Sequence, residues 1–89
     1  MRTQSITLTN KLGLHARAAG KLVQCAAGFE SEVRVAREDR QVNAKSIMGV
    51  LMLAAPCGTE LQLECEGPDE EAALAALVAL IDNRFGEAQ

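Results

Sequence analysis

The feature that most constrains this chain is the order in which strand-like and helical patterns alternate along only 89 residues. Apolar residues recur at helical spacing in the longer stretches and alternate with polar ones in the shorter stretches. Strands are expected at residues 3–9, 31–37, 41–43 and 60–66, and helices at residues 16–27, 47–53 and 70–85. The order β-α-β-β-α-β-α predicts one α+β domain over residues 1–89. It is a two-layer open-faced sandwich, with the helices on one face of an antiparallel sheet and water on the other.

Several residues should set the ends of the helices. Ser46 and Asp69 stand at N-cap positions, where a side-chain oxygen can accept a hydrogen bond from the first turn. Gly28 should close the first helix at its C′ position, and Gly86 should end the last one. The core must be aliphatic, because the chain has no Trp or Tyr and only two Phe. Residues expected to face it include Ile6, Leu8, Ala19, Leu22, Leu61, Leu63, Cys65, Leu77, Ile81 and Phe85.

The charge balance argues against two classes of partner. Twelve acidic and nine basic residues give a net charge of −3, whereas a nucleic-acid binder needs a basic face. The same balance disfavours binding to an anionic membrane surface, and no apolar run approaches the length of a signal peptide or membrane span. We therefore expect a soluble, cytoplasmic protein with no nucleic-acid partner and no membrane insertion.

The three cysteines, Cys25, Cys57 and Cys65, form no CxxC pair and leave one thiol over in any disulfide scheme. With one histidine in the chain, a Cys/His zinc site is not expected. Buried or half-buried free thiols in a reducing cytosol fit this pattern best. Since the sequence also lacks a Gly-rich nucleotide loop and a carboxylate pair, we expect no metal and no cofactor.

The single histidine, His15, falls at the start of the first helix, where it contributes little as a cap. The helix dipole and the unpaired N–H groups of the first turn, beginning at Ala16, favour an anion there. Arg17 adds a guanidinium that can hold phosphate oxygens in a fork. The group predicts a phosphohistidine site, although its spacing alone leaves open an ordinary surface histidine.

Two longer stretches strengthen this interpretation. Residues 10–21 contain Gly-Leu-His-Ala-Arg, and residues 43–55 contain Ala-Lys-Ser-Ile-Met-Gly. Together they resemble the HPr family of histidine phosphocarriers, which belong to the phosphoenolpyruvate-dependent phosphotransferase system of bacteria. The resemblance covers essentially the whole chain and implies three helices on a four-stranded sheet of strand order 1-4-2-3.

The resemblance also implies a mechanism and partners. An enzyme I-type donor would phosphorylate His15 through Nδ1, with Ala16 and Arg17 holding the phosphate, and an enzyme IIA-type acceptor would receive it. The chain would act as a monomeric carrier with these partner enzymes rather than as a stand-alone enzyme.

The second helix is too apolar for its length. If Val50 and Leu53 point inward, other apolar side chains are left outside, and a small exposed apolar patch of this kind often marks a partner surface. The resemblance to the HPr family implies that this helix lies beside His15 and that both contribute to docking of phosphoryl donors and acceptors. A helix buried on most sides is the alternative. The expected partner-binding residues are Ile47, Met48, Leu51 and Met52.

Ser46 has a second expected role beside helix capping. In part of the family the matching serine is phosphorylated by a dedicated kinase, so a serine kinase/phosphorylase is a further candidate partner. The presence of Ser46 is necessary for such regulation but is not sufficient for it.

Two departures bear on the branch of the family. Ala18 replaces a proline usual in sugar-transport members, and Gln24 and Ala27 replace lysines. The chain is thus more similar to the nitrogen-related carriers (NPr). The alternatives are a general sugar-transport HPr, or a non-catalytic regulatory module that binds through the second helix.

Overall fold

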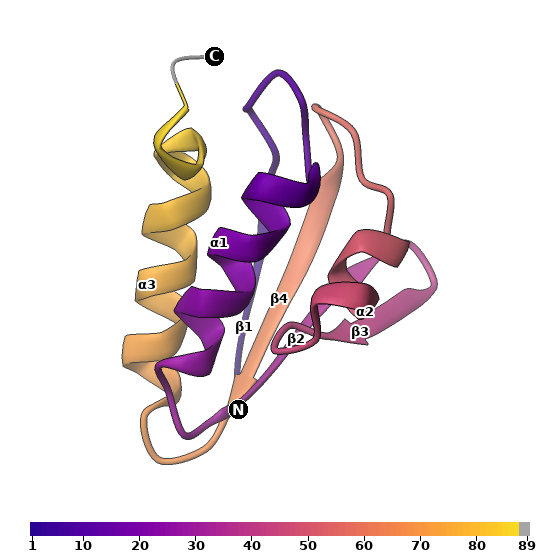
Figure 1. Ribbon diagram of the computed structural model, residues 1–89. Coiled ribbons are helices and arrows are strands. Elements are labelled where there is room, and N and C mark those ends of the chain that lie inside the picture. The colour runs from indigo at the N-terminus through magenta and orange to yellow at the C-terminus, as the bar shows by residue number, and fades with distance from the viewer. Residues whose placement is uncertain (88–89) are drawn as a thin grey trace.

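The computed structural model describes residues 1–87 and forms two layers (Figure 1). The strands are β1 (Arg2–Thr7), β2 (Glu32–Arg37), β3 (Arg40–Asn43) and β4 (Glu60–Glu66). The helices are α1 (Ala16–Ala27), α2 (Ile47–Met52), α3 (Glu70–Asp82) and the short 3₁₀ helix η1 (Arg84–Gly86). The strands pair antiparallel in the order β1-β4-β2-β3, and α1, α2 and α3 lie on one face of the sheet. The expected fold class and strand order are confirmed.

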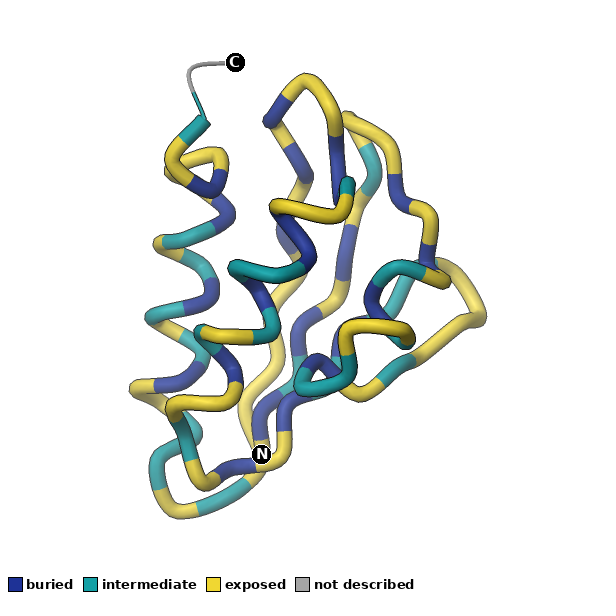
Figure 2. Tube along the Cα trace, viewed as in Figure 1, coloured by how far each residue is buried: buried dark blue, intermediate teal, exposed yellow. Residues whose placement is uncertain are grey.

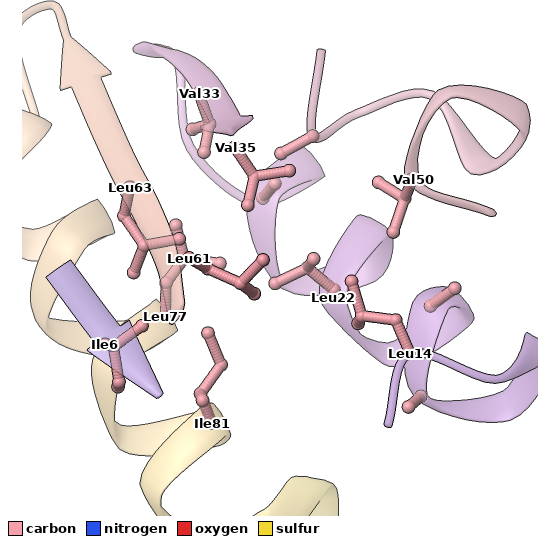
Figure 3. Packing of buried hydrophobic residues seen from close by; sticks show 14 of the residues in the cluster. Ile6, Leu14, Leu22, Val33, Val35, Val50, Leu61, Leu63, Leu77 and Ile81 are labelled. Atoms are coloured by element: carbon pink, nitrogen blue, oxygen red, sulfur yellow. The ribbon is translucent and has the colours of Figure 1, made fainter. Parts of the chain in front are cut away.

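The register of the central strand β4 brings apolar residues together. Leu61 pairs with Ile6 of β1, while Leu63 pairs with Val35 of β2. Side chains on alternate positions of a strand share one face, so these residues all point toward the helices. Figure 3 shows them packed against Leu77, Ile81 and Leu22 from the helical layer.

The opposite face of the sheet is polar and open. Buried and exposed positions alternate along β4 (Figure 2). On β2, Arg34 forms ion pairs with Glu64 at 2.5 Å and Glu66 at 3.0 Å. These pairs offset like charges on neighbouring strands, as expected for a face in contact with water.

Asp69 departs from its expected role. It precedes α3, but its side chain makes no capping hydrogen bond. Its carboxylate accepts hydrogen bonds from the backbone N–H groups of Glu30 and Ser31, each at 2.9 Å, and from the Ser31 hydroxyl. The Ser31 hydroxyl and these amides hold the pKa of the Asp69 carboxyl below its usual value. Asp69 thus ties the loop before α3 to the loop before β2.

The expected helix C-termini also need correction. Gly28 follows α1 but keeps right-handed backbone angles, so its freedom to adopt positive φ is not used. α3 ends at Asp82 instead of Phe85. Arg84 and Phe85 both have φ of 55°, a left-handed conformation that turns the chain back toward α1.

Ser46 caps α2 as expected, because its Oγ accepts a hydrogen bond from the Gly49 amide at 3.2 Å. At the other end of α2, Arg40 donates to the carbonyl of Met52 at 2.8 Å, and Arg37 to that of Leu53 at 2.8 Å. Each guanidinium donates a hydrogen bond to a carbonyl group that the helix end leaves without an intrahelical partner. A helix of only six residues is therefore held at both ends.

The cysteines are free thiols. Cys65 is buried and Cys25 half-buried, and burial raises the pKa of both. Cys57 is exposed, contrary to expectation, since it lies in the turn that follows Pro56. Within residues 1–87, no group of three or more His, Cys, Asp and Glu side chains is arranged to hold a metal. Nor does this part of the chain contain a helix long and apolar enough to cross a membrane.

Candidate functional site

His15 is the N-cap residue of α1. Its backbone is extended, with φ of −70° and ψ of 174°, and its carbonyl accepts a hydrogen bond from the Ala19 amide at 2.8 Å. The imidazole makes no capping hydrogen bond, and 27% of the side chain is exposed. The backbone N–H groups of Ala16 and Arg17 lie in the first turn, where an α-helix offers no carbonyl to accept their hydrogen bonds. The ring therefore stands beside the positive end of the helix dipole.

The loop before His15 is positioned by close backbone contacts. Gly13 has φ of +65°, and a Cβ atom there would lie 2.4 Å from the carbonyl oxygen of Ala55. That same oxygen accepts a hydrogen bond from the Leu14 amide at 2.9 Å. Only glycine fits this approach, so the loop that leaves α2 fixes the loop that carries His15.

A shallow pocket of about 400 Å³ surrounds the imidazole. Arg17 is exposed there and, with Lys11, brings positive charge to the same pocket as the first-turn amides. An anion in this position would meet two cationic side chains and the helix N-terminus. The pocket is lined by Lys11, Leu12, His15, Arg17 and Glu87.

Glu87 is a further residue of the site that the sequence does not predict. Its carboxylate contacts Nε2 of His15 and accepts a hydrogen bond from the side-chain Nδ2 of Asn10 at 3.0 Å. The Asn10 hydrogen bond, followed by the contact with His15, holds the pKa of the Glu87 carboxyl below its usual value. No motif marks this residue, because the contact depends on how the chain turns after α3.

The exposed residues of α2 agree in part with the expected partner surface. Ile47, Met48 and Met52 are 41%, 65% and 64% exposed, whereas Val50 and Leu53 are buried as expected. The expectation that α2 leaves apolar side chains outside is therefore confirmed. α2 also packs on α1, the helix that begins after His15.

The exposure of two leucines differs from expectation. Leu51 is half-buried and packs against the core, so it contributes less surface than its neighbours. Leu12 is 66% exposed and lines the pocket around His15, although no sequence motif indicates this role. We call the exposed residues Ile47, Met48 and Met52 of α2 the apolar patch.

Ser46 lies outside the pocket around His15. It is half-buried, and its hydroxyl is engaged with the first turn of α2, where the apolar patch begins. The neighbouring Lys45 extends in another direction and donates to the Phe29 carbonyl at 2.7 Å. The structure thus separates Ser46 from His15 while joining it to the exposed residues of α2.

Comparisons with known proteins agree with this geometry. The family model described as "PTS HPr component phosphorylation site" matches residues 2–83. The chain belongs to the HPr family of phosphocarriers. Relatives named phosphocarrier protein HPr include those of Cupriavidus necator, 57% identical over 89 residues, and Pseudomonas aeruginosa, 53% identical over 90 residues. Each of these alignments covers 100% of both proteins.

Solved HPr structures share the fold. HPr-C-His from Thermoanaerobacter tengcongensis gives a TM-score of 0.97 at 46% identity, covering 100% of both chains. An HPr dimer from the same organism gives a TM-score of 0.79 at 47% identity, covering 98% of this chain and 100% of the other. The family is therefore represented by a dimer as well, and the expected monomer remains a prediction for this chain.

Proposed function

We propose that His15 accepts a phosphoryl group from an enzyme I-type donor charged by phosphoenolpyruvate and passes it to an enzyme IIA-type acceptor. The observation that carries the proposal is the partly exposed imidazole of His15 at the N-terminus of α1, in one pocket with Arg17. In the forward step, the ring attacks the donor's phosphohistidine. The new P–N bond forms as the donor's P–N bond breaks, and the electron pair returns to the donor's ring.

The surroundings of His15 suit a relay. The amides of Ala16 and Arg17 and the Arg17 guanidinium would hold the phosphate by charge-assisted hydrogen bonds. All these groups lie at the surface, so the phosphate stays accessible to the next histidine. A buried site would hold the phosphoryl group more tightly and slow its departure. Catalytic power then comes largely from partners that bring two histidines into line.

We assign docking of both partners to the apolar patch, with Leu51 behind it as support. Exposed methionines adapt to several partner surfaces, and a contiguous exposed apolar area often marks an interaction site. Partner enzymes that cover this patch would approach the pocket around His15 at the same time, because α2 packs on α1.

We further propose that phosphorylation of Ser46 by a serine kinase would regulate docking. The hydroxyl stands at the N-terminus of α2, where negative charge is favourable for the helix. The same charge would face a partner seated on the neighbouring apolar patch. The fold would tolerate the modification while the partner complex would not.

We also propose that this carrier belongs to the nitrogen-related branch of the family, on the basis of Ala18, Gln24 and Ala27. Ala18 is fully buried, whereas Gln24 and Ala27 are exposed on α1, where lysines would add positive charge. A less basic α1 favours partners different from those of a sugar-transport carrier. We place this monomeric carrier and its enzymes in the cytoplasm.

A relay assay tests the proposed function. Purified protein is labelled by an enzyme I-type donor with phosphoenolpyruvate, separated from the donor, and mixed with enzyme IIA-type acceptors of the nitrogen-related and sugar-transport kinds. We expect acid-labile label on the carrier and its passage to an acceptor, faster to the nitrogen-related kind. A carrier that takes no label, or keeps it against both acceptors, contradicts the proposal. Faster transfer to the sugar-transport acceptor contradicts the branch alone.

A further inference from the structure

The carboxylate of Glu87 joins His15 to the loop that precedes it. Oε2 contacts Nε2 of His15, and Oε1 accepts a hydrogen bond from Nδ2 of Asn10 at 3.0 Å. Glu87 stands 72 positions after His15 and lies beyond residues 2–83, which the family model matches. The contact therefore comes from this chain's C-terminal segment and not from the motif around the histidine.

Tertiary contacts hold this segment in a conformation that local preferences disfavour. Arg84 and Phe85 have φ of 55° and Gly86 has φ of 78°, although left-handed angles are unfavourable for residues other than glycine. Phe85 is only 1% exposed, and its carbonyl accepts a hydrogen bond from Nζ of Lys21 at 2.5 Å. These contacts offset the backbone strain, and the turn that they fix carries Glu87 to His15.

The position requires two acceptor atoms. The Asn10 side chain is fully buried, and its Nδ2 donates both to Glu87 and to the Gly13 carbonyl, at 2.7 Å for the latter. A carboxylate can face this donor with one oxygen and the ring N–H of His15 with the other. A glutamine would offer one acceptor and would turn its own NH₂ group toward the remaining donor.

The ionised carboxylate also determines which ring nitrogen carries the proton. Glu87 has a lowered pKa and is ionised at neutral pH, so it can only accept hydrogen bonds. Nε2 of His15 must then donate. In a neutral imidazole with its proton on Nε2, the free lone pair resides on Nδ1.

We propose that Glu87 is a positioning residue that keeps Nε2 of His15 protonated and thereby presents Nδ1 to the phosphoryl donor. This inference rests on the phosphorylation of His15 proposed above. The Nδ1 lone pair forms the new P–N bond, while the donor's P–N bond breaks and its electron pair returns to the donor's ring. Because Nε2 keeps its proton, the ring of His15 gains positive charge, which the Glu87 carboxylate stabilises from the opposite side of the ring.

The first test measures the ring directly and needs no partner enzyme. Ring ¹⁵N chemical shifts of His15 are recorded at about pH 9, where imidazole is neutral, for the wild type and Glu87→Ala. We expect a protonated Nε2 and an unprotonated Nδ1 in the wild type, and values moved toward a mixture of tautomers in Glu87→Ala. Equal ring shifts in the wild type and Glu87→Ala, or a protonated Nδ1 in the wild type, would overturn the inference.

The second test measures phosphoryl transfer from the donor. Glu87→Ala should lower kcat about tenfold with little change in KM, the effect of one charge-assisted hydrogen bond. Asp82→Asn, which removes an exposed negative charge at the end of α3, is the matched control and should transfer at the wild-type rate. An unchanged kcat, or a loss confined to KM, would overturn the positioning role. Failure of the wild type to take up phosphate would instead overturn the proposed function, while the ring shifts still decide whether Glu87 holds the proton on Nε2.

Discussion

Two substitutions at Ser46 should separate the stability of the fold from the docking of partners. Ser46→Ala removes the hydroxyl that accepts the Gly49 amide at 3.2 Å, and α2 has only six residues to absorb the loss. Loss of an N-cap costs about 1 kcal/mol, which lowers the Tm of a domain of this size by roughly 4–8 °C. Transfer by this variant should stay near the wild-type rate, because Ser46 is not part of the pocket around His15.

Ser46→Asp should do the reverse. Its carboxylate can still accept the Gly49 amide and is favoured by the positive end of α2, so the Tm stays equal or rises slightly. A partner seated on the apolar patch must desolvate the new charge, at a cost of about 1–3 kcal/mol, or roughly 5- to 150-fold in affinity.

The assay is the initial rate of phosphorylation against donor concentration, with the Tm of each variant measured in parallel. Ser46→Asn is the matched control, since it keeps a capping oxygen without the charge. Met48→Glu should raise KM as Ser46→Asp does, because it places a charge within the apolar patch. Unchanged KM for both acidic variants would refute the reasoning and place the docking surface elsewhere.

Three further changes probe other contacts. Arg17→Ala should slow transfer roughly 10- to 150-fold, as loss of ~1.5–3 kcal/mol of charge-assisted bonding implies. Arg17→Lys should restore only part of the rate because the fork is lost, and wild-type transfer kinetics in Arg17→Ala would show that the guanidinium is only solvated. The pKa of Asp69 is lower in the folded state than in the unfolded state, where it is about 4. Its contribution to stability is therefore complete above the unfolded pKa and is lost as the pH falls through the pKa of the folded state. Melting curves from pH 7 to pH 2 should therefore show a steeper acid loss in the wild type than in Asp69→Asn, and parallel curves would contradict this. Ala54→Gly should raise stability by about 0.5–1 kcal/mol in urea unfolding, because Ala54 has φ of 50°; an unchanged or lower midpoint would argue against strain at that position.

Local patterns were sufficient wherever a short stretch of sequence determines the outcome. The alternation around Leu61 and Leu63 predicted a strand with one buried face, and β4 has that face. Ser46 was identifiable as a cap because capping involves the next few residues alone. The surplus of apolar residues after Ser46 likewise predicted that Met48 and Met52 would be exposed.

Contacts between distant segments were not predictable in this way. Asp69 has the chemistry of an N-cap, but the Ser31 hydroxyl and the amides beside it attract its carboxylate more effectively. The periodic pattern of α3 continues through Phe85, yet that ring is buried from the left-handed turn of η1 and not from a continuation of α3. Glu87 reaches His15 only because of this turn, so no local rule could have included it in the site.

The residue that takes the phosphoryl group can be identified directly by mass spectrometry. Wild-type protein and His15→Ala are incubated with an enzyme I-type donor and phosphoenolpyruvate, and intact masses are measured before and after mild acid treatment. We expect one acid-labile phosphoryl group on the wild type and none on His15→Ala, with Ser46→Ala labelled like the wild type. The His15 side chain makes no capping hydrogen bond, so His15→Ala should remain folded in circular dichroism. Acid-labile phosphate on folded His15→Ala would contradict the account.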